Sequence, residues 1–519
     1  MLACGGSGDG GTPGTGGSGN ASGTAGTTGS AGTSGTAGTT GSAGTGGSAA
    51  TAGTSGNAGT GGSSATAGTG GSSATAGTGG SSATAGTGGS AGTGGATGNG
   101  GRGGTTGAGG GGMSGHGGTT GTGGATGTGG GTAGTTGTAG TGGGSGQTHW
   151  VGTWTGAPQL TETANNPPAA LTGSVLRQVV RVTLGGSQIR VRFSNEFGNG
   201  NVVINAAHVA VCKANPMDST IDTATDKALA FSGMASVTIA QSQAVWSDPV
   251  DFTVAGLSNL SVTVAFGSVP SNVTGHPGSR TTSYEQTGST TVNAANMTSA
   301  MKADHWYILS GVDVMADASA KGMVILGDSI TDGRGSTTNA NDRWPDDLAK
   351  RLQNNTATAK VSVMNQGIGG NAVTSGGLGP TAQARYMRDV LNQSGVKYIV
   401  IFEGVNDLGG GATASSITTI FDSFITMAHS KGLLIYGATI TPFGSNSYYS
   451  AGNETNRQSV NTYVRGTKFD GFIDFDAAVK DTSNPPKLQA AYDSGDGLHL
   501  SPAGYQKMAD TIDLTLFTR

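Results

Sequence analysis

The stretch Met323-Val324-Ile325-Leu326-Gly327-Asp328-Ser329-Ile330-Thr331 decides the fold of the second half of this 519-residue chain. Four consecutive apolar residues predict a strand that is buried on both faces, and a glycine turn with polar residues follows at once. Similar apolar runs lie at residues 361–364, 398–402, 433–436 and 472–475. The sequence therefore predicts five buried strands between residues 319 and 519.

Helical patterns separate these runs. Apolar residues recur at helical spacing at 344, 348 and 352 and again between 417 and 428. A last helix is expected from Pro502, with Ser501 as its N-cap. Alternation of strand and helix indicates a parallel sheet with helices on both faces, and such α/β sheets bind ligands at the carboxyl ends of their strands.

Polar residues gather where the predicted strands end. Ser329 follows the first strand, the glycine-rich segment 365–371 follows the second, and segment 404–407 follows the third. Segment 496–499, Asp-Gly-Leu-His, precedes the final helix. Because parallel strands share one carboxyl edge, we expect these four segments to converge there.

Each of these residue types has a task in acyl transfer. Ser329 is the candidate nucleophile and His499 the base that takes its proton, while Asp496 can hold the imidazole in the required tautomer. An oxyanion needs fixed donors, for which we nominate the amides of Ser329 and Gly370 and the side chain of Asn406.

These four segments resemble the blocks of the SGNH, or GDSL, hydrolase superfamily of serine esterases, over roughly residues 320–519. The resemblance implies a flavodoxin-like, five-stranded parallel sheet with helices on both faces. It implies Ser329, Asp496 and His499 as the catalytic triad, and Gly370 and Asn406 as members of the oxyanion hole. Gly367 and Gly369 lie close by, but the family pattern favours Gly370.

Two rival interpretations remain. Residues 367–372 match the G-x-G-x-x-A form of a dinucleotide-binding turn, although this leaves the other three segments unexplained. A catalytically inactive surface binding protein could also keep such a scaffold. Asp328 and Asp407 are interpreted as structural supports of their turns.

Residues 147–318 alternate between apolar and polar positions, which predicts an accessory β domain of antiparallel sheets, a jelly-roll-like sandwich. The runs on either side of Gly185-Gly186 predict a β-hairpin. Four tryptophans, at 150, 154, 246 and 306, are expected to fill much of the core. This segment is similar to the β domain of secreted bacterial members of the superfamily, some of them polysaccharide deacetylases.

Residues 1–146 consist almost wholly of Gly, Ser, Thr and Ala, which predicts a low-complexity, disordered tether. The start Met1-Leu2-Ala3-Cys4-Gly5 resembles the end of a bacterial lipoprotein signal. We therefore expect lipidation of Cys4, and a protein that is secreted or held at the bacterial cell surface.

Charge and cysteine content exclude other classes. The net charge is −4 and no basic run occurs, so nucleic acid is not an expected partner. The chain has two cysteines, and its histidines lack the spacing of a metal site, so we expect neither a metal nor another cofactor. No segment predicts a membrane-spanning helix, which leaves the lipid anchor as the only expected membrane contact.

The expected function is that of a serine ester hydrolase that removes short acyl groups, such as acetyl, from a polysaccharide. Small-molecule esters would be turned over by the same chemistry. Lipase or lysophospholipase activity on lipid acyl esters is the alternative, because a fold does not fix its substrate.

Overall fold

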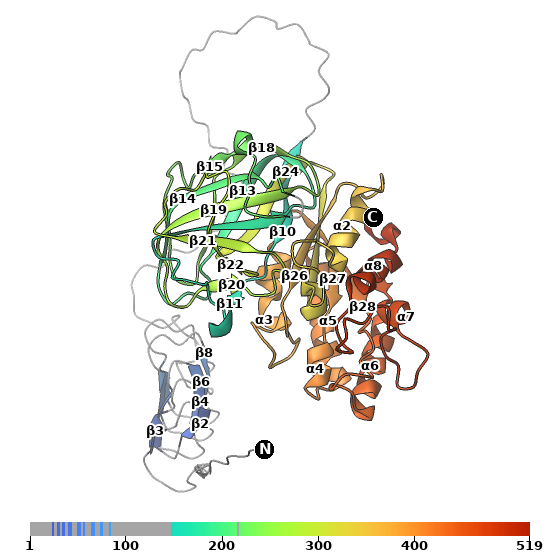
Figure 1. Ribbon diagram of the computed structural model, residues 1–519. Coiled ribbons are helices and arrows are strands. Elements are labelled where there is room, and N and C mark those ends of the chain that lie inside the picture. The colour runs from blue at the N-terminus through green and yellow to red at the C-terminus, as the bar shows by residue number, and fades with distance from the viewer. Residues whose placement is uncertain are drawn as a thin grey trace, which may run out of the picture. The chain divides into compact units, whose positions relative to one another are not determined.

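The computed structural model describes residues 147–214 and 217–519, together with the backbone of nine short strands between residues 23 and 84 (Figure 1). The chain divides into two units, Met1–Gly137 and Thr138–Arg519. The predicted accessory domain and the predicted hydrolase domain both lie in the second unit, so the division at residues 318 and 319 stays a prediction. Among the described residues, no helix is long and apolar enough to cross a membrane.

The first unit contains short parallel strands that the sequence did not predict. One sheet joins β1 (Gly23–Thr24), β3 (Ser34–Thr36), β5 (Ala49–Ala52), β7 (Ser64–Ala67) and β9 (Ser82–Thr84). The other joins β2 (Thr28–Ala31), β4 (Thr40–Ala43), β6 (Ser55–Asn57) and β8 (Ser73–Thr75). The repeated sequence lets like residues pair, as Ser64 does with Ser82. The prediction of a disordered tail is not confirmed, and Cys4 lies outside the described residues.

A five-stranded parallel sheet forms the second half of the second unit, in the order β26-β25-β27-β28-β29. Its strands are β25 (Lys321–Gly327), β26 (Val361–Gly367), β27 (Val396–Phe402), β28 (Leu434–Ala438) and β29 (Phe472–Ile473). Each contains residues of a predicted apolar run, so the predicted parallel sheet is confirmed. The last strand is shorter than expected because Asp474 caps the next helix by accepting a hydrogen bond from the N–H of Ala477.

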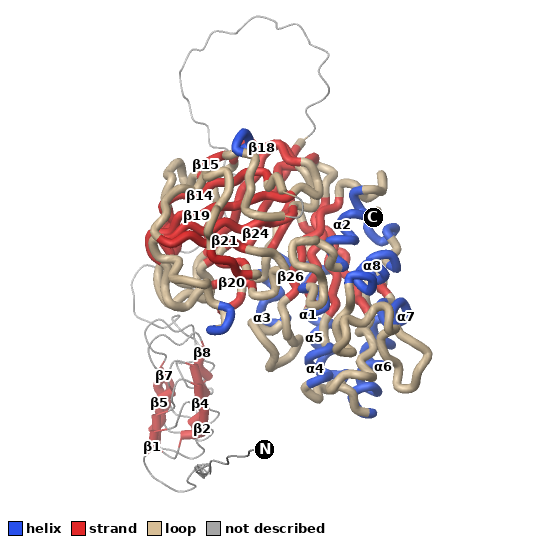
Figure 2. The backbone as a smooth tube through the Cα atoms, viewed as in Figure 1, coloured by secondary structure: helices blue, strands red, loops and turns tan. Residues whose placement is uncertain are grey.

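Two groups of helices pack against this sheet (Figure 2). One group contains α2 (Trp344–Gln353), α7 (Phe475–Val479) and α8 (Pro502–Thr511), in which α8 contacts both α2 and α7. The other contains α3 (Ala382–Tyr386), the π-helix η4 (Met387–Leu391), α5 (Ala414–Ser430) and α6 (Ala451–Val464). Short helices α1 (Ser329–Asp332) and α4 (Val405–Gly409) follow strand ends, and η5 (Leu514–Phe517) ends the chain. Because the chain reverses its direction across the sheet after β26, right-handed crossovers place the two groups on opposite faces.

Antiparallel sheets form the first half of the second unit. One contains β10 (Thr148–Thr155), β24 (Leu309–Asp317), β13 (Gly186–Ser194), β17 (Ala244–Trp246) and β18 (Val250–Val254). A larger one contains β15 (Lys227–Leu229), β14 (Val202–Val211), β16 (Val237–Ile239), β19 (Asn259–Ser268), β12 (Ser174–Arg181), β21 (Ser283–Thr287) and β22 (Met301–Ala303). A third joins β11 (Gln159–Leu160), β20 (Thr274–His276) and β23 (Trp306–Tyr307), and η2 (Thr163–Asn165) and η3 (Thr223–Thr225) are single turns. Buried side chains of the first two sheets share one core, while the jelly-roll arrangement itself stays a prediction.

The predicted hairpin around Gly185-Gly186 is wrong. Strand β12 pairs with β19 and β21, whereas β13 pairs with β24, β17 and β18, so the chain passes from one sheet to another at this point. A Cβ on Gly185 would lie 2.4 Å from the carbonyl oxygen of Val254. The glycine therefore permits a close approach of two backbone segments, and the sequence signal for that resembles the signal for a tight turn.

The four tryptophans divide into two pairs. Trp154 and Trp306 are buried and meet edge to face, with ring centroids 4.8 Å apart. Trp150 and Trp246 are half-buried and flank the guanidinium of Arg190, at 4.7 and 4.5 Å from their ring centroids. The expectation that all four fill the core is therefore correct for two of them.

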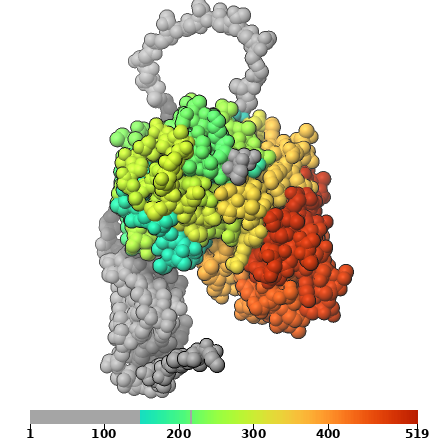
Figure 3. Space-filling model, in the orientation of Figure 1, coloured from blue at the N-terminus to red at the C-terminus, as the bar shows by residue number. Residues whose placement is uncertain are grey.

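Side chains from the part of the chain with the antiparallel sheets cover the edge strand β26. Figure 3 shows that this part of the second unit adjoins the part with the parallel sheet. The hydroxyl of Thr183 accepts a hydrogen bond from the N–H of Val363 at 2.8 Å and lies 3.0 Å from the carbonyl oxygen of Val363. Thr155 donates to the carbonyl of Asn365 at 3.0 Å, and Ser362 donates to the carbonyl of Gly152 at 2.6 Å. Backbone groups that an edge strand would leave unpaired are thus satisfied by this contact.

Replacing Thr183 by valine should destabilise the protein, because the buried N–H of Val363 loses its acceptor while the side-chain shape is kept. We expect a loss of about 1–3 kcal/mol in the free energy of unfolding, measured by chemical denaturation. Thr253→Val, at an exposed position of β18, is the control and should stay near the parent value. Equal stability of both variants would contradict the proposed covering contact.

Candidate active site

Three parallel strands end at one level, and this brings the segments after them together. Gly327 of β25 pairs with Gly367 of β26 on one side and with Phe402 of β27 on the other. The chain leaves each strand directly after these residues or one residue later. The three segments that the sequence singled out after these strands therefore begin from neighbouring points of one sheet edge.

Ser329 is the first residue of the short helix α1, directly after β25. Asp328 is the N-cap, and its side chain accepts a hydrogen bond from the N–H of Ile330 at 2.9 Å. The turn is tight, because a Cβ on Gly327 would lie 2.2 Å from the hydroxyl of Thr331. Ser329 is mostly buried, with 6% of its surface exposed. Asp328 thus supports the turn that presents the serine, as the sequence predicted.

His499 and Asp496 reach Ser329 from the loop before α8. The Oγ of Ser329 lies 2.8 Å from Nε2 of His499, and Nδ1 of His499 lies 2.6 Å from Oδ2 of Asp496. The other oxygen of Asp496 accepts from the N–H groups of Leu498 and His499 at 3.0 and 2.8 Å. The carboxylate therefore holds both the ring and the backbone that carries it.

Burial and charge act in opposite directions on His499. Desolvation lowers the pKa of its imidazole, the hydrogen bond and negative charge of Asp496 raise it, and the positive charges of Arg334 and Arg280 lower it again. The result is a pKa below the ordinary value of 6.5. For Asp496, burial works to raise the pKa, but the N–H and ring of His499 outweigh it and the pKa is lowered. The ring is thus neutral, and the carboxylate ionised, near neutral pH.

Gly370 and Asn406 line the same cavity as Ser329. Gly370 has a left-handed backbone with φ of +71°, and among the described residues its N–H donates to no acceptor. Asn406, in α4, donates from Nδ2 to the carbonyl of Asn371 at 2.7 Å. Both are therefore in place to offer N–H groups to a ligand.

A cavity of about 380 Å³ is lined by Ser329, His499, Gly370 and Asn406. Together with Asp496, which contacts His499, these are all of the residues that the sequence nominated for the site outside the tail. The structure brings the five together around one space. This proximity is the basis for assigning them catalytic roles.

The dinucleotide interpretation of residues 367–372 lacks its helix. Such a turn must lead directly into a helix whose N-terminus meets the phosphates. Here α3 begins only at Ala382. The glycine turn instead packs against α1, since a Cβ on Gly367 would lie 2.4 Å from the backbone nitrogen of Asp332.

One wall of the cavity comes from strand β11 and from turns and loops between the antiparallel strands. The sequence did not predict this wall. It is formed by Gln159, Glu162, Asn165, Pro277, Gly278, Arg280 and His305. Glu162 accepts hydrogen bonds from Gln159 and Asn165 at 2.8 and 3.1 Å. Arg280 makes no ion pair with any described residue, and its backbone φ is +50°. These residues are more than 100 positions from Ser329 or lie in irregular loops, so no sequence spacing could connect them to the site.

A histidine of the antiparallel sheets also contacts the helix that carries Ser329. Nε2 of His276 lies 2.8 Å from Oδ1 of Asp332, and its Nδ1 lies 3.0 Å from the carbonyl oxygen of Ala157. The ring stacks on Trp306 with centroids 5.6 Å apart. His276 and Asp332 are both buried, so this contact fixes α1 against the neighbouring part of the molecule.

Buried carboxyl groups lie behind the serine. Desolvation raises the pKa of Asp328 to about 7 and raises that of Glu403 well above its usual value, while nearby Arg385 acts to lower both. Asp407 accepts hydrogen bonds from the N–H groups of Val373 and Thr374 at 2.7 and 2.9 Å. Asp407 thus ties the segment after β27 to the segment after β26, the structural role that the sequence predicted. Among the described residues, no group of three or more His, Cys, Asp or Glu is placed to hold a metal ion.

The pKa of His499 can be measured directly by NMR titration of the imidazole, with the resonance assigned from a His499→Gln variant. We expect a midpoint below 6.5 because burial disfavours the imidazolium. Asp496→Asn should lower the midpoint further, because the carboxylate is the main group that favours the charged ring. A midpoint above 6.5, or an upward shift in Asp496→Asn, would contradict this geometry.

Comparison with known proteins finds similarity in the C-terminal part of the chain. Residues 325–507 match the model of the GDSL-like lipase/acylhydrolase family. A putative lipolytic protein of the G-D-S-L family from Desulfitobacterium hafniense is 19% identical, covering 38% of this chain and 99% of that one, with a TM-score of 0.30. A putative acylhydrolase from Bacteroides fragilis is also 19% identical, over 39% and 88% of the two chains, with a TM-score of 0.30. An acetyl xylan esterase, AlAXEase, is 21% identical over 37% and 96%, with a TM-score of 0.29.

A search of curated proteins finds no match. The assignment therefore rests on the family model, which spans the serine, the glycine turn, the asparagine and the Asp-x-x-His segment. Residues 325–507 thus form a domain of the GDSL-like lipase/acylhydrolase type, which confirms the resemblance to the SGNH/GDSL superfamily for this part of the chain.

Proposed function

We propose that this protein is a serine ester hydrolase that works through an acyl-serine intermediate. Ser329 is the nucleophile, His499 the general base and Asp496 the group that orients the imidazole. One observation carries the proposal: a continuous series of contacts runs from the Oγ of Ser329 through the ring of His499 to Asp496, with distances of 2.8 and 2.6 Å. Nucleophile, base and orienting carboxylate in this order are what acyl transfer requires.

The reaction would proceed in two halves. The Oγ of Ser329 attacks the acyl carbon of the ester and gives its proton to Nε2 of His499. The tetrahedral intermediate collapses, and His499 returns the proton to the departing alcohol oxygen. Water then attacks the acyl-serine, with its proton again accepted by His499, and the carboxylic acid leaves as the Ser329 hydroxyl is restored. No cofactor takes part in these steps.

Three N–H groups would stabilise the negative oxygen of each intermediate. These are the backbone amides of Ser329 and Gly370 and the side-chain amide of Asn406, all of which belong to residues that line the cavity. Removal of one such donor typically costs roughly 10²-fold or more in rate. The unused N–H of Gly370 supports its assignment.

The proposed substrate is a polysaccharide that carries short acyl groups such as acetyl. The support is the composition of the cavity wall, where Glu162 and Asn165 at the single turn η2 and Arg280 in the loop after β20 offer polar groups that can bind sugar hydroxyls. Pro277, Leu378, Tyr448 and Leu498 also line the cavity and provide an apolar surface for a short acyl group. We further propose, from the sequence alone, a secreted or surface-tethered protein with its lipid on Cys4.

Ser329→Ala should abolish turnover of an aryl acetate, because no other hydroxyl lies next to His499 in the contacts described. Loss of a serine nucleophile costs up to roughly 10⁶-fold in kcat. The measurement is release of the aryl alcohol, with unfolding curves to show that the fold is kept. Ser423→Ala, at an exposed serine of α5, is the matched control and should retain full activity. Residual turnover in Ser329→Ala close to the parent rate would refute the acyl-serine mechanism.

The substrate class can be tested by the preferred length of the acyl chain and by the kind of molecule, glycan or lipid, that bears it. We expect acetate release from acetylated xylan or pectin, and an aryl ester series in which acetyl exceeds octanoyl. Arg280→Gln should raise KM for the acetylated glycan about tenfold, the value of one charged hydrogen bond, with little effect on an aryl acetate. Lys227→Gln, an exposed change on β15, serves as the control. Faster release of fatty acid from lysophospholipid than of acetate from any glycan would favour the lipid alternative.

A further inference from the structure

Tyr448 lies in the loop between β28 and α6, outside every sequence segment that predicted the site. Its hydroxyl lies 3.0 Å from Oδ1 of Asn406, and it lines the same cavity as Ser329. We propose that Tyr448 is a positioning residue that fixes the side-chain amide of Asn406 so that its free N–H points at the oxyanion. This inference rests on the proposed function, and in particular on Asn406 as an oxyanion donor.

The contacts of Asn406 settle which way its amide faces. The carbonyl oxygen of Asn371 can only accept a hydrogen bond, so the atom 2.7 Å from it must be Nδ2. The oxygen of the amide then faces Tyr448, whose hydroxyl must be the donor. Burial raises the pKa of Tyr448, so this hydroxyl keeps its proton at neutral pH.

One hydrogen of the amide is then left over. Nδ2 of Asn406 carries two hydrogens, and the contact with Asn371 uses one of them. Among the described residues the second hydrogen has no acceptor, and Asn406 lines the cavity beside Ser329. Tyr448 thus binds the oxygen of the amide, and Asn371 binds one hydrogen of its nitrogen. The second hydrogen of Nδ2 is left to face the cavity.

Asn371 provides a firm support on its side. Its own side chain donates to the carbonyls of Leu378 and Pro380 at 2.9 and 2.8 Å and accepts from Arg385 at 3.0 Å. Asn371 also follows Gly370, the other proposed donor. The carbonyl that holds Asn406 is therefore fixed independently, and Tyr448 is the group that prevents the amide from rotating away from it.

Tyr448 is itself fixed at three points. Its N–H donates to Asn446 at 3.0 Å, and its carbonyl accepts from Asn453 at 2.8 Å. The ring lies against Gly409, where an added Cβ would come within 2.5 Å of a ring carbon. Asn446 in turn donates to the backbone carbonyl of Asp496 at 2.8 Å. One short loop therefore contacts both the oxyanion side and the carboxylate side of the site.

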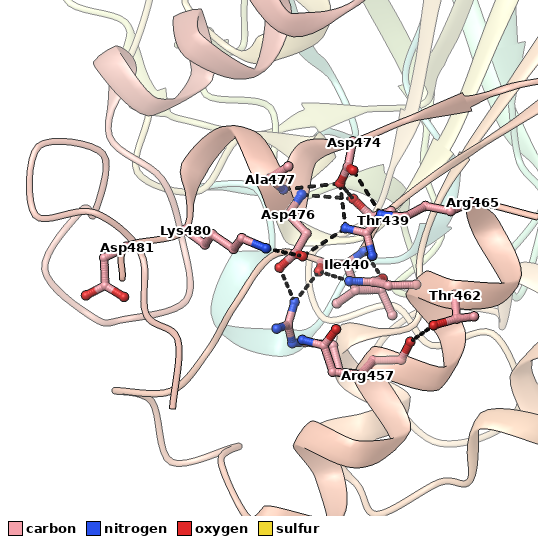
Figure 4. Close-up of polar contacts among 12 residues, drawn as sticks. Thr439, Ile440, Arg457, Thr462, Arg465, Asp474, Asp476, Ala477, Lys480 and Asp481 are labelled. Carbon is pink, nitrogen blue, oxygen red and sulfur yellow. Dashed lines mark hydrogen bonds and ion pairs between the residues drawn. The ribbon is translucent and has the colours of Figure 1, made fainter. Parts of the chain in front are cut away.

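An ion-pair network holds the base of this loop, as Figure 4 shows. The carbonyl of Ile440 accepts from Arg457 at 2.8 Å and from Asn461 at 2.9 Å, and its N–H donates to Asn461 at 2.7 Å. Arg457 also binds Asp476 at 2.5 Å, and Arg465 binds Asp476 at 2.9 Å. The loop thus starts from a point that is tied to α6 and to the start of α7.

The test replaces Tyr448 by phenylalanine, which removes the hydroxyl and keeps the ring. On an aryl acetate we expect kcat to fall about three- to tenfold, the range of one neutral hydrogen bond, with KM unchanged. The inhibition constant of a boronic acid that forms a tetrahedral adduct on Ser329 should rise by the same factor. The acid limb of the pH profile should not move, because the contacts of His499 are intact.

Two further variants separate positioning from general damage. Tyr449→Phe changes the exposed neighbouring tyrosine and should leave all of these constants at parent values. Gly409→Ala should reproduce the loss in Tyr448→Phe, because its methyl group displaces the ring. Thermal unfolding of each variant shows whether the fold is kept.

A double-mutant cycle with Asn406→Ala decides the inference. Asn406→Ala alone should lower kcat by roughly 10²-fold, and adding Tyr448→Phe should then cost nothing more, because no amide remains to be positioned. A further loss of the same size in the Asn406→Ala background, or an effect on KM alone, would overturn the role of Tyr448. An Asn406→Ala variant with parent kcat would instead overturn the oxyanion role of Asn406, and with it the proposed function of that side chain.

Discussion

The site depends on the register of three parallel strands, whose last residues pair with one another so that the strands end side by side. Because Gly327, Gly367 and Phe402 pair across β26, β25 and β27, the segments that follow these strands start from neighbouring points. A shift of one residue in either pairing would move a whole segment along the sheet edge and turn its side chains to the other face. Glycine at two of these three positions lets the chain turn directly out of the strand, which keeps Ser329 at the edge.

The sequence predicted the parts of the molecule whose signal is local. Buried parallel strands are continuous apolar runs, so all five were found, and each polar segment was identified by its place after a strand or before a helix. The hairpin at Gly185 was predicted wrongly, because a glycine needed for close backbone contact resembles a glycine in a turn. Tyr448 and Arg280 could not be found, because they reach the cavity from loops whose sequence has no periodicity and no fixed distance from Ser329.

The antiparallel sheets do two things for the parallel one. The segment that contains Thr183 forms hydrogen bonds with backbone groups of Val363 in β26. Loops and turns of the same part of the chain form one wall of the cavity. The two effects are connected. Since β26 is the edge strand and leads into the glycine turn at Gly370, whatever covers that edge also reaches the side of the cavity next to the turn. Covering the edge of the sheet and shaping the cavity are thus consequences of one packing arrangement.

Negative charge beside Ser329 would oppose the oxyanion of an acyl-transfer intermediate, yet several carboxyl groups lie close to the serine. For Asp328 and Asp407 the structure supplies a compensation. Burial raises the pKa of Asp328 to about 7, and Asp407 accepts from two backbone N–H groups. Oδ1 of Asp332 lies 2.8 Å from Nε2 of His276, whose Nδ1 lies 3.0 Å from the carbonyl oxygen of Ala157. Arg280 and Arg334 line the cavity together with Ser329, so positive charge borders the space in which an anionic intermediate would form.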